Sequence, residues 1–105
     1  MNITSQTTPE RIVISIEGRI DTTNYGEFEN SVNKILENRA SEVVLDCKGL
    51  SYISSSGLRV FLSMHKKMLG TDGRLVLKSL QPSIKEIFDI SGFSSIFNID
   101  KSESS

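Results

Sequence analysis

A strand–helix–strand pattern in the middle of the chain most narrows what this sequence can fold into. The run Val43–Leu45 is short, continuous and apolar, which favours a central strand covered on both faces over an edge strand. The stretch 74–78 reads as a second strand, and between the two lies a stretch from Ser55 whose apolar residues recur at helical spacing. A helix that joins two strands in this way gives a βαβ unit with a right-handed crossover. The pattern therefore predicts an α/β fold.

The two ends of the chain predict further strands. Ile3–Thr7 alternates weakly in polarity, and Arg11–Glu17 is rich in β-branched residues. Thr8–Glu10 between them is a turn signal, so we expect an antiparallel pair whose second strand ends at Gly18. Near the C-terminus, Ser95–Ile99 reads as a last short strand. The sheet is thus expected to be mixed, with four or five strands.

Three or four helices are expected to pack on this sheet. Asp21 and Thr22 are both good N-cap candidates for the first helix, because their side-chain oxygens can accept the free N–H groups of the first turn. Pro82 suits the first turn of a later helix, and Gly92 suits its C-terminal end. The residues at helical spacing on the apolar faces of these two helices are Tyr25, Phe28, Val32, Ile35 and Leu36, and Ile84, Ile87 and Phe88.

The helix from Ser55 has an unusually wide apolar arc. Its central stripe consists of Leu58, Phe61, Leu62, His65, Met68 and Leu69. Val60 and Met64 widen the arc to about 200°, whereas a helix covered on one side needs an arc of roughly 100°. Two interpretations stand: another helix covers it together with the sheet, or Val60 and Met64 border a partner surface. The residues before it, Cys47–Ser54, are expected to form a packed connection.

Length, charge and composition favour one soluble domain. The chain has 105 residues with a formal net charge of −1, and its basic residues do not cluster beyond Lys66–Lys67. We expect no nucleic-acid partner, because such binding depends on clustered cations. A single cysteine, Cys47, polar residues at 1–10 and no run of 18 apolar residues predict a cytoplasmic protein without a signal peptide or membrane span. The expected domain spans 1–105, ordered over about 3–99 and frayed over 100–105.

The residue types that carry enzyme chemistry are sparse. The one histidine, His65, falls on the apolar stripe and would point away from the serines at the helix start. Ser63 and Lys66 match the short Ser-x-x-Lys pattern of serine acyl-enzymes, but the companion motifs are missing. One cysteine and one histidine cannot supply a typical zinc site, and Asp46 reads as a solvated strand-end carboxylate rather than a magnesium ligand. We therefore expect no catalytic residue, no metal and no cofactor.

A serine-rich helix start remains as the candidate site. Ser54, Ser55 and Ser56 directly precede Gly57. A serine N-cap is ordinary, but it accounts for one hydroxyl and not for three. The free N–H groups and the positive end of the helix dipole favour a phosphate there, and a phosphoserine adds about −1.5 to −2 charges. We therefore predict a reversible phosphorylation site, beside which Gly57 would keep the surface clear for a kinase.

Three stretches, in order along the chain, carry a resemblance to a known family. They read GRID at 18–21, ISSSGLR at 53–59 and IKEIFDISGF at 84–93. The first resembles the Gly-x-Leu/Ile-Asp element, the second the signature and the third the late helix and turn of the bacterial anti-sigma factor antagonists, the STAS domains. The resemblance covers nearly the whole chain, and it implies a single STAS-like α/β domain.

The resemblance also implies a regulatory protein, not an enzyme, that works by partner switching. In the family, the unphosphorylated antagonist binds an anti-sigma factor that is also a GHKL-type serine kinase, and this frees the sigma factor. The kinase uses ATP to phosphorylate a serine of the motif, and the complex falls apart. A PP2C-type serine phosphatase restores the active form. The antagonist is expected to be a monomer or a weak dimer.

The family's site residues fall on the serine stretch. The family acceptor follows an Asp and stands two places before the Gly, which is Ser55 here, with Ser54 and Ser56 as alternates. Ser54 occupies the place of that Asp, which leaves open a STAS scaffold module that binds partners in a larger signalling complex without being phosphorylated. A small hydrolase using Ser55 or Ser63 is disfavoured, because no base is placed to activate either serine. The expected partner-binding residues are Asp21, Thr22, Ser54, Ser56, Gly57, Leu58, Arg59 and Val60.

Overall fold

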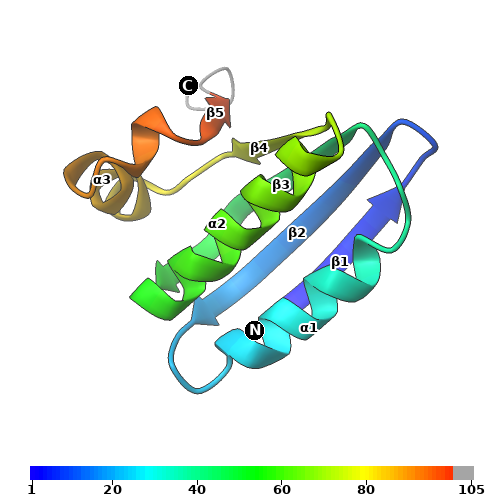
Figure 1. Cartoon of the computed structure of the whole chain (residues 1–105). Helices are drawn as coiled ribbons and strands as arrows, with labels where there is room; N and C mark the ends of the chain where they lie inside the picture. Colours follow the sequence, from blue (N-terminus) through cyan, green and yellow to red (C-terminus); the bar gives the residue numbers. More distant parts are fainter. Residues whose placement is uncertain (101–105) are drawn as a thin grey trace.

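The computed structural model describes residues 1–100 as a five-stranded sheet with three helices (Figure 1). In chain order the elements are β1 (Asn2–Thr7), β2 (Arg11–Ile20), α1 (Tyr25–Ile35), β3 (Glu42–Ile53), α2 (Ser55–Gly70), β4 (Arg74–Lys78), α3 (Pro82–Ile90), the 3-10 turn η1 (Phe93–Ser95) and β5 (Asn98–Asp100). β1 pairs with β2 antiparallel, and the other neighbours are parallel. The predicted mixed α/β fold is confirmed. Of the tail expected to fray over 100–105, Asp100 is instead the last residue of β5, and residues 101–105 lie outside the described residues.

All three helices lie on one face of the sheet, and the topology explains why. The strand order follows the chain order from β1 to β5. Each parallel connection therefore steps to the next strand in the same direction, and right-handed crossovers in one direction place their helices on the same face. The alternation along β2 agrees, because Ile12, Ile14 and Ile16 are buried whereas Arg11 and Glu17 are exposed.

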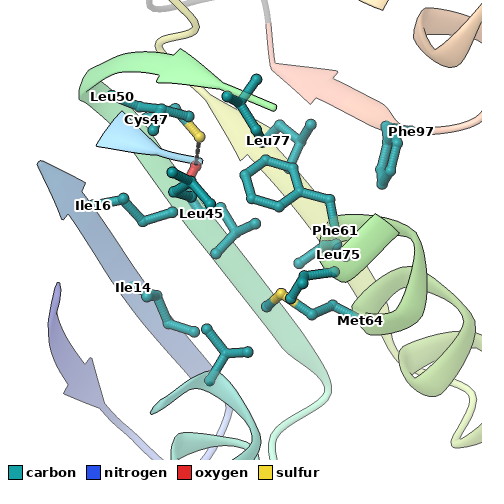
Figure 2. Close-up of a cluster of buried hydrophobic side chains, with 14 of the residues drawn as sticks. Ile14, Ile16, Leu45, Cys47, Leu50, Phe61, Met64, Leu75, Leu77 and Phe97 are labelled. Carbon is teal, nitrogen blue, oxygen red and sulfur yellow. Dashed lines mark hydrogen bonds between the residues drawn. The ribbon is translucent and has the colours of Figure 1, made fainter. Parts of the chain in front are cut away.

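The core fills the space between this face and the helices. Phe61 of α2 lies at its centre, with ring centroids of Phe28, Phe88 and Phe97 at 5.8, 6.3 and 6.5 Å. Figure 2 shows Phe61 and Met64 pointing from α2 toward strand residues that include Leu45. These rings come from the three helices and from Phe97, which directly precedes β5. The core therefore packs α1 and the segment before β5 against the same helix, α2.

The opposite face carries no helix within residues 1–100, which corrects the expectation of a central strand covered on both faces. Val44 of β3 and Val76 of β4 point to this face and are nevertheless only 9% exposed. Their neighbours in the sheet include Glu42, whose carboxylate accepts from the Nε atoms of Arg11 and Arg74 at 2.7 and 2.8 Å. Long side chains of this kind cover apolar surface with their stems while their charged ends stay in water.

Two strands run further than the sequence predicts. β3 continues through the stretch 47–53, expected to be a connection, and β2 continues past Gly18 to Ile20. Gly18 has φ of +99°, and the pairing of β2 with β3 shifts register on both sides of it. On the neighbouring strand Gly49 pairs with Glu17, and a Cβ on Gly49 would lie 2.8 Å from Cγ of Glu17. The two glycines thus let the strands stay paired through an irregular stretch.

The start of α1 also differs from the prediction. The N-cap position is Asn24, and its side chain makes no cap hydrogen bond, so neither Asp21 nor Thr22 caps the helix. Instead, Asp21 Oδ1 accepts from the backbone N–H and the Oγ1 of Thr23, at 2.9 and 2.6 Å. Asn24 Oδ1 accepts from the backbone N–H of Asp21 at 2.8 Å. These side chains accept hydrogen bonds from N–H groups of the turn before the helix. The N-cap is therefore Asn24, three residues after Asp21.

The wide apolar arc of α2 is explained by a second helix. Val60 and Met64 are 3% and 2% exposed, and α1 lies beside α2 on the same face of the sheet (Figure 1). The first interpretation of the arc is therefore confirmed, because both side chains are buried. Leu69, placed on the central stripe, is 59% exposed. No helix of the described residues is long and apolar enough to cross a membrane.

Two isoleucines of α3 test this description of the core. Ile84 is 1% exposed and Ile90 is 79% exposed, so the same substitution removes buried contacts at one site and almost none at the other. We expect Ile84→Ala to lower the free energy of unfolding by about 2–5 kcal/mol. Ile90→Ala should change it by less than about 0.5 kcal/mol. Urea unfolding of both variants measures this, and equal losses would contradict the packing of α3.

Candidate functional site

The candidate site lies where β2 and β3 end and α2 begins. In the last paired residues, Arg19 stands opposite Tyr52 and Ile20 opposite Ile53. The backbone N–H of Ser54 donates to the Ile20 carbonyl oxygen at 2.9 Å, and α2 starts at the next residue. Because parallel strands end at the same edge of a sheet, the serine stretch and the turn that follows β2 share this edge. The sheet therefore fixes the position of the first turn of α2.

Ser54 is the N-cap of α2. Its backbone is extended, and its Oγ accepts from the backbone N–H of Gly57 at 3.2 Å. The residue is only 8% exposed. Serine and aspartate are both preferred N-caps, because each offers an oxygen to the first turn. Serine at the place where the resemblance expects Asp thus keeps the cap and removes a carboxylate.

Ser55 and Ser56 are the first two residues of the helix and differ in exposure. Ser55 is exposed, and Ser56 is half-buried. Neither side chain makes a hydrogen bond within residues 1–100, in contrast to Ser54. The backbone N–H groups at the start of a helix also have no intrahelical partner. Ser55 therefore presents an unengaged hydroxyl on the surface at the positive end of a helix.

Gly57 is a packing requirement, which corrects its expected role of keeping the surface clear. It is buried, and a Cβ there would lie 2.8 Å from Cγ2 of Ile20 and 2.8 Å from Cγ1 of Ile53. Real Cβ atoms do not approach other atoms so closely. The glycine lets α2 rest directly on the ends of β2 and β3.

The structure divides the expected partner-binding residues into two groups. Thr22 and Arg59 are exposed, and Asp21 and Ser56 are half-buried. The buried members, each at most 9% exposed, are Ser54, Gly57, Leu58 and Val60. The buried residues support the exposed ones and offer little surface to a partner.

Two exposed tyrosines of this region were missed by the sequence analysis. Tyr52 is 38% exposed, and the guanidinium of Arg19 lies 4.4 Å from its ring centroid, a cation–π contact. Tyr25 is 40% exposed and lines a hollow of about 200 Å³ between α1 and α2. The other residues that line this hollow are Glu29, Ser56, Arg59 and Val60. Tyrosine and arginine are enriched among the residues that dominate protein–protein binding.

Three titratable groups at or near the site have identifiable local environments. Hydrogen bonds from the side chain and backbone N–H of Thr23 lower the pKa of Asp21, so this carboxylate is charged and engaged locally. His65 packs its ring against Phe97 at 5.3 Å, on the core side of α2. Burial raises the pKa of the Cys47 thiol. No group of three or more His, Cys, Asp or Glu that could hold a metal occurs among residues 1–100.

The cap can be tested by substitution. Ser54→Ala removes the only side-chain acceptor for the Gly57 N–H, and we expect it to lower the free energy of unfolding by about 1 kcal/mol. Ser54→Asp should retain stability, because it restores an accepting oxygen. Ser55→Ala, which removes no hydrogen bond, is the matched control and should stay within about 0.5 kcal/mol. Equal losses at positions 54 and 55 in urea unfolding would argue against the cap.

Comparisons with known proteins agree with this geometry. The STAS domain family model matches residues 2–105. BtrV of Bordetella bronchiseptica, a candidate anti-sigma factor antagonist, is 35% identical over 102 residues, which are 97% of this chain and 88% of that protein. The solved structure of the anti-sigma factor antagonist SpoIIAA in its unphosphorylated form is similar, with a TM-score of 0.79 and 20% sequence identity. The match covers 98% of this chain and 91% of the SpoIIAA chain.

SpoIIAA of Bacillus in its phosphorylated form is similar as well, with a TM-score of 0.71, 20% identity and coverage of 98% and 95%. At this identity the two structures establish the likeness of fold. The family match spans the sheet, the three helices and the serine-bearing start of α2. The chain belongs to the STAS domain family and is a relative of the bacterial anti-sigma factor antagonists.

Proposed function

We propose that the chain is an anti-sigma factor antagonist that switches partners through phosphorylation of Ser55. The unphosphorylated form binds an anti-sigma factor that is also a GHKL-type serine kinase, and the sigma factor is released. The kinase transfers the γ-phosphoryl group of ATP to Ser55 Oγ; the hydroxyl gives up its proton and ADP leaves. A PP2C-type phosphatase hydrolyses the phosphoserine. Such a switch operates in the cytoplasm, where sigma factors act.

The observation that carries the proposal is the contrast between Ser54 and Ser55. The Ser54 hydroxyl is buried and holds the helix cap, so its modification would remove the cap. The Ser55 hydroxyl is exposed and makes no hydrogen bond within residues 1–100 that phosphorylation would break. Ser56 is half-buried beside the hollow between the helices. A kinase can therefore reach Ser55 without disturbing the fold.

A phosphate on Ser55 is compatible with the folded domain. It would stand at the positive end of α2, where the backbone N–H groups of the first turn favour an anion. The first turn contains no acidic residue that would repel it. SpoIIAA, which has the same fold, is known in both an unphosphorylated and a phosphorylated form. The phosphate is thus expected to act on binding and not on folding.

The expected effect on binding is large because the surface around Ser55 is suited to a close interface. Tyr25 and Arg59 line the hollow that Ser56, the residue after Ser55, also lines, and Tyr52 stands three residues before Ser55; all three are exposed and can act as anchors. A phosphate brought into such an interface adds about two negative charges and must lose water. A loss of several kcal/mol in binding free energy is enough to separate the partners, since each 1.4 kcal/mol is about tenfold in affinity.

The second candidate function, a STAS scaffold module that is not phosphorylated, rests on Ser54. The family places an Asp beside the acceptor, and serine at this position keeps the cap but leaves the kinase no carboxylate to recognise. If this reading holds, Ser55→Asp should leave the affinity for the anti-sigma factor unchanged. In the switching model the added carboxylate weakens binding.

The main test uses the anti-sigma factor kinase of the same organism with ATP. We expect mass spectrometry to find the phosphate on Ser55, and titration calorimetry to show at least a roughly hundredfold loss of affinity on modification. Ser55→Ala should bind as the native chain does and stay unmodified. Ser63→Ala, which removes an exposed serine from the same helix, should behave like the native chain. Absence of phosphate from residues 54–56 would sink the switching mechanism.

A further inference from the structure

We propose that Arg59 is the internal counter-ion of a phosphate on Ser55, so that the modified residue forms an ion pair within α2. This inference rests on the proposed phosphorylation of Ser55 and adds a role for a second residue of the same helix. It assigns to Arg59 the task of holding the phosphate against the domain. It also means that modification changes the position of a cation, and not only the charge of one serine.

The helix geometry brings the two residues together. Ser55 is the first residue of α2 and Arg59 follows four residues later, so both lie on one face with Cβ atoms about 5–6 Å apart. Helical side chains lean toward the N-terminus, so the long arginine side chain extends over the turn that carries Ser55. Arg59 and Ser56 line the same hollow, which places the Arg59 side chain beside the first turn.

Arg59 is available for this role. It is exposed, and it makes no ion pair or side-chain hydrogen bond within residues 1–100. Its positive charge also lies near the N-terminus of α2, where the helix dipole disfavours cations as long as Ser55 is unmodified. The first turn of α2 contains no acidic residue to offset it. A dianionic phosphate on Ser55 would reverse this balance, since an acid four residues before a base is the favourable order.

Two other charged groups at this edge are already engaged. The Arg19 guanidinium lies over the Tyr52 ring, and the Asp21 carboxylate accepts from Thr23. Glu29 of α1 lines the hollow with Arg59, but the two form no ion pair within 4.0 Å. Phosphorylation would therefore draw Arg59 from the hollow between α1 and α2 toward Ser55. On the surface that is expected to face the anti-sigma factor, the Arg59 charge would then be paired with the phosphate.

The test compares full-length chains in which phosphoserine is incorporated at position 55 during synthesis, so that no kinase is needed. The readout is the second pKa of the phosphate, about 6 in an unperturbed phosphoserine, followed by ³¹P NMR. A neighbouring cation stabilises the dianion and lowers this pKa. We expect the pKa in the native background to be lower by roughly 0.3 units or more than in Arg59→Gln. Arg59→Lys should retain most of the shift.

Lys66→Gln is the matched control, because it removes one cation from the same helix. Lys66 lies eleven residues from Ser55, about 16 Å along the axis, which exceeds the Debye length of about 8 Å at physiological salt. The phosphate pKa measured in Lys66→Gln should equal the pKa measured in the native background. Equal pKa values in Arg59→Gln and Lys66→Gln would overturn the inference. A shifted pKa with undiminished affinity for the anti-sigma factor would support the inference and contradict the switch instead.

Discussion

The contact between α2 and the ends of β2 and β3 at Gly57 is the constraint on which the rest of the site depends. No side chain larger than hydrogen fits between this helix and the buried Ile20 and Ile53. Because the helix rests there, the Gly57 N–H in its first turn can be capped by Ser54, and the hydroxyl of the next residue, Ser55, is exposed. The exposure of Ser55 is thus a consequence of core packing. The motif combines a packing glycine, a cap and a surface serine, each with a separate physical task.

The sequence predicted the order of the elements well, because the central strands and the helices have clear apolar periodicity. The prediction was wrong for the second half of β3, where β3 has lost its pairing with β4. β3 pairs with β4 only as far as Asp46, and beyond that point its partner is β2 alone. There the strand needs one apolar face, so it carries Lys48, Gly49 and Ser51 between buried residues, and this composition reads as a loop. The extension matters, because it carries the chain to Ser54.

The candidate site was predicted in part, for similar reasons. The serine stretch and its helix start could be identified from residue type and spacing. Tyr52 could not be placed beside Arg19, because their alignment depends on the irregular pairing around Gly18. Val60 was assigned to a partner surface because an apolar residue at its helical position can face either a partner or a neighbouring helix. Only the position of α1 shows that the side chain is buried. Cross-strand register and helix neighbours are properties of the whole fold, which local patterns do not contain.

Serine in place of the family's Asp at position 54 would change the electrostatics of the proposed switch more than its structure. An Asp N-cap already offsets the positive end of a helix before any modification occurs, whereas a serine cap is neutral. Here the first turn of α2 contains no acidic residue, and the Arg59 guanidinium forms no ion pair within residues 1–100. If Ser55 is phosphorylated, the phosphate is the first negative charge in this turn, and it meets two uncompensated positive partners. The substitution that weakens the likeness to the family thus favours a phosphate held closely to the domain.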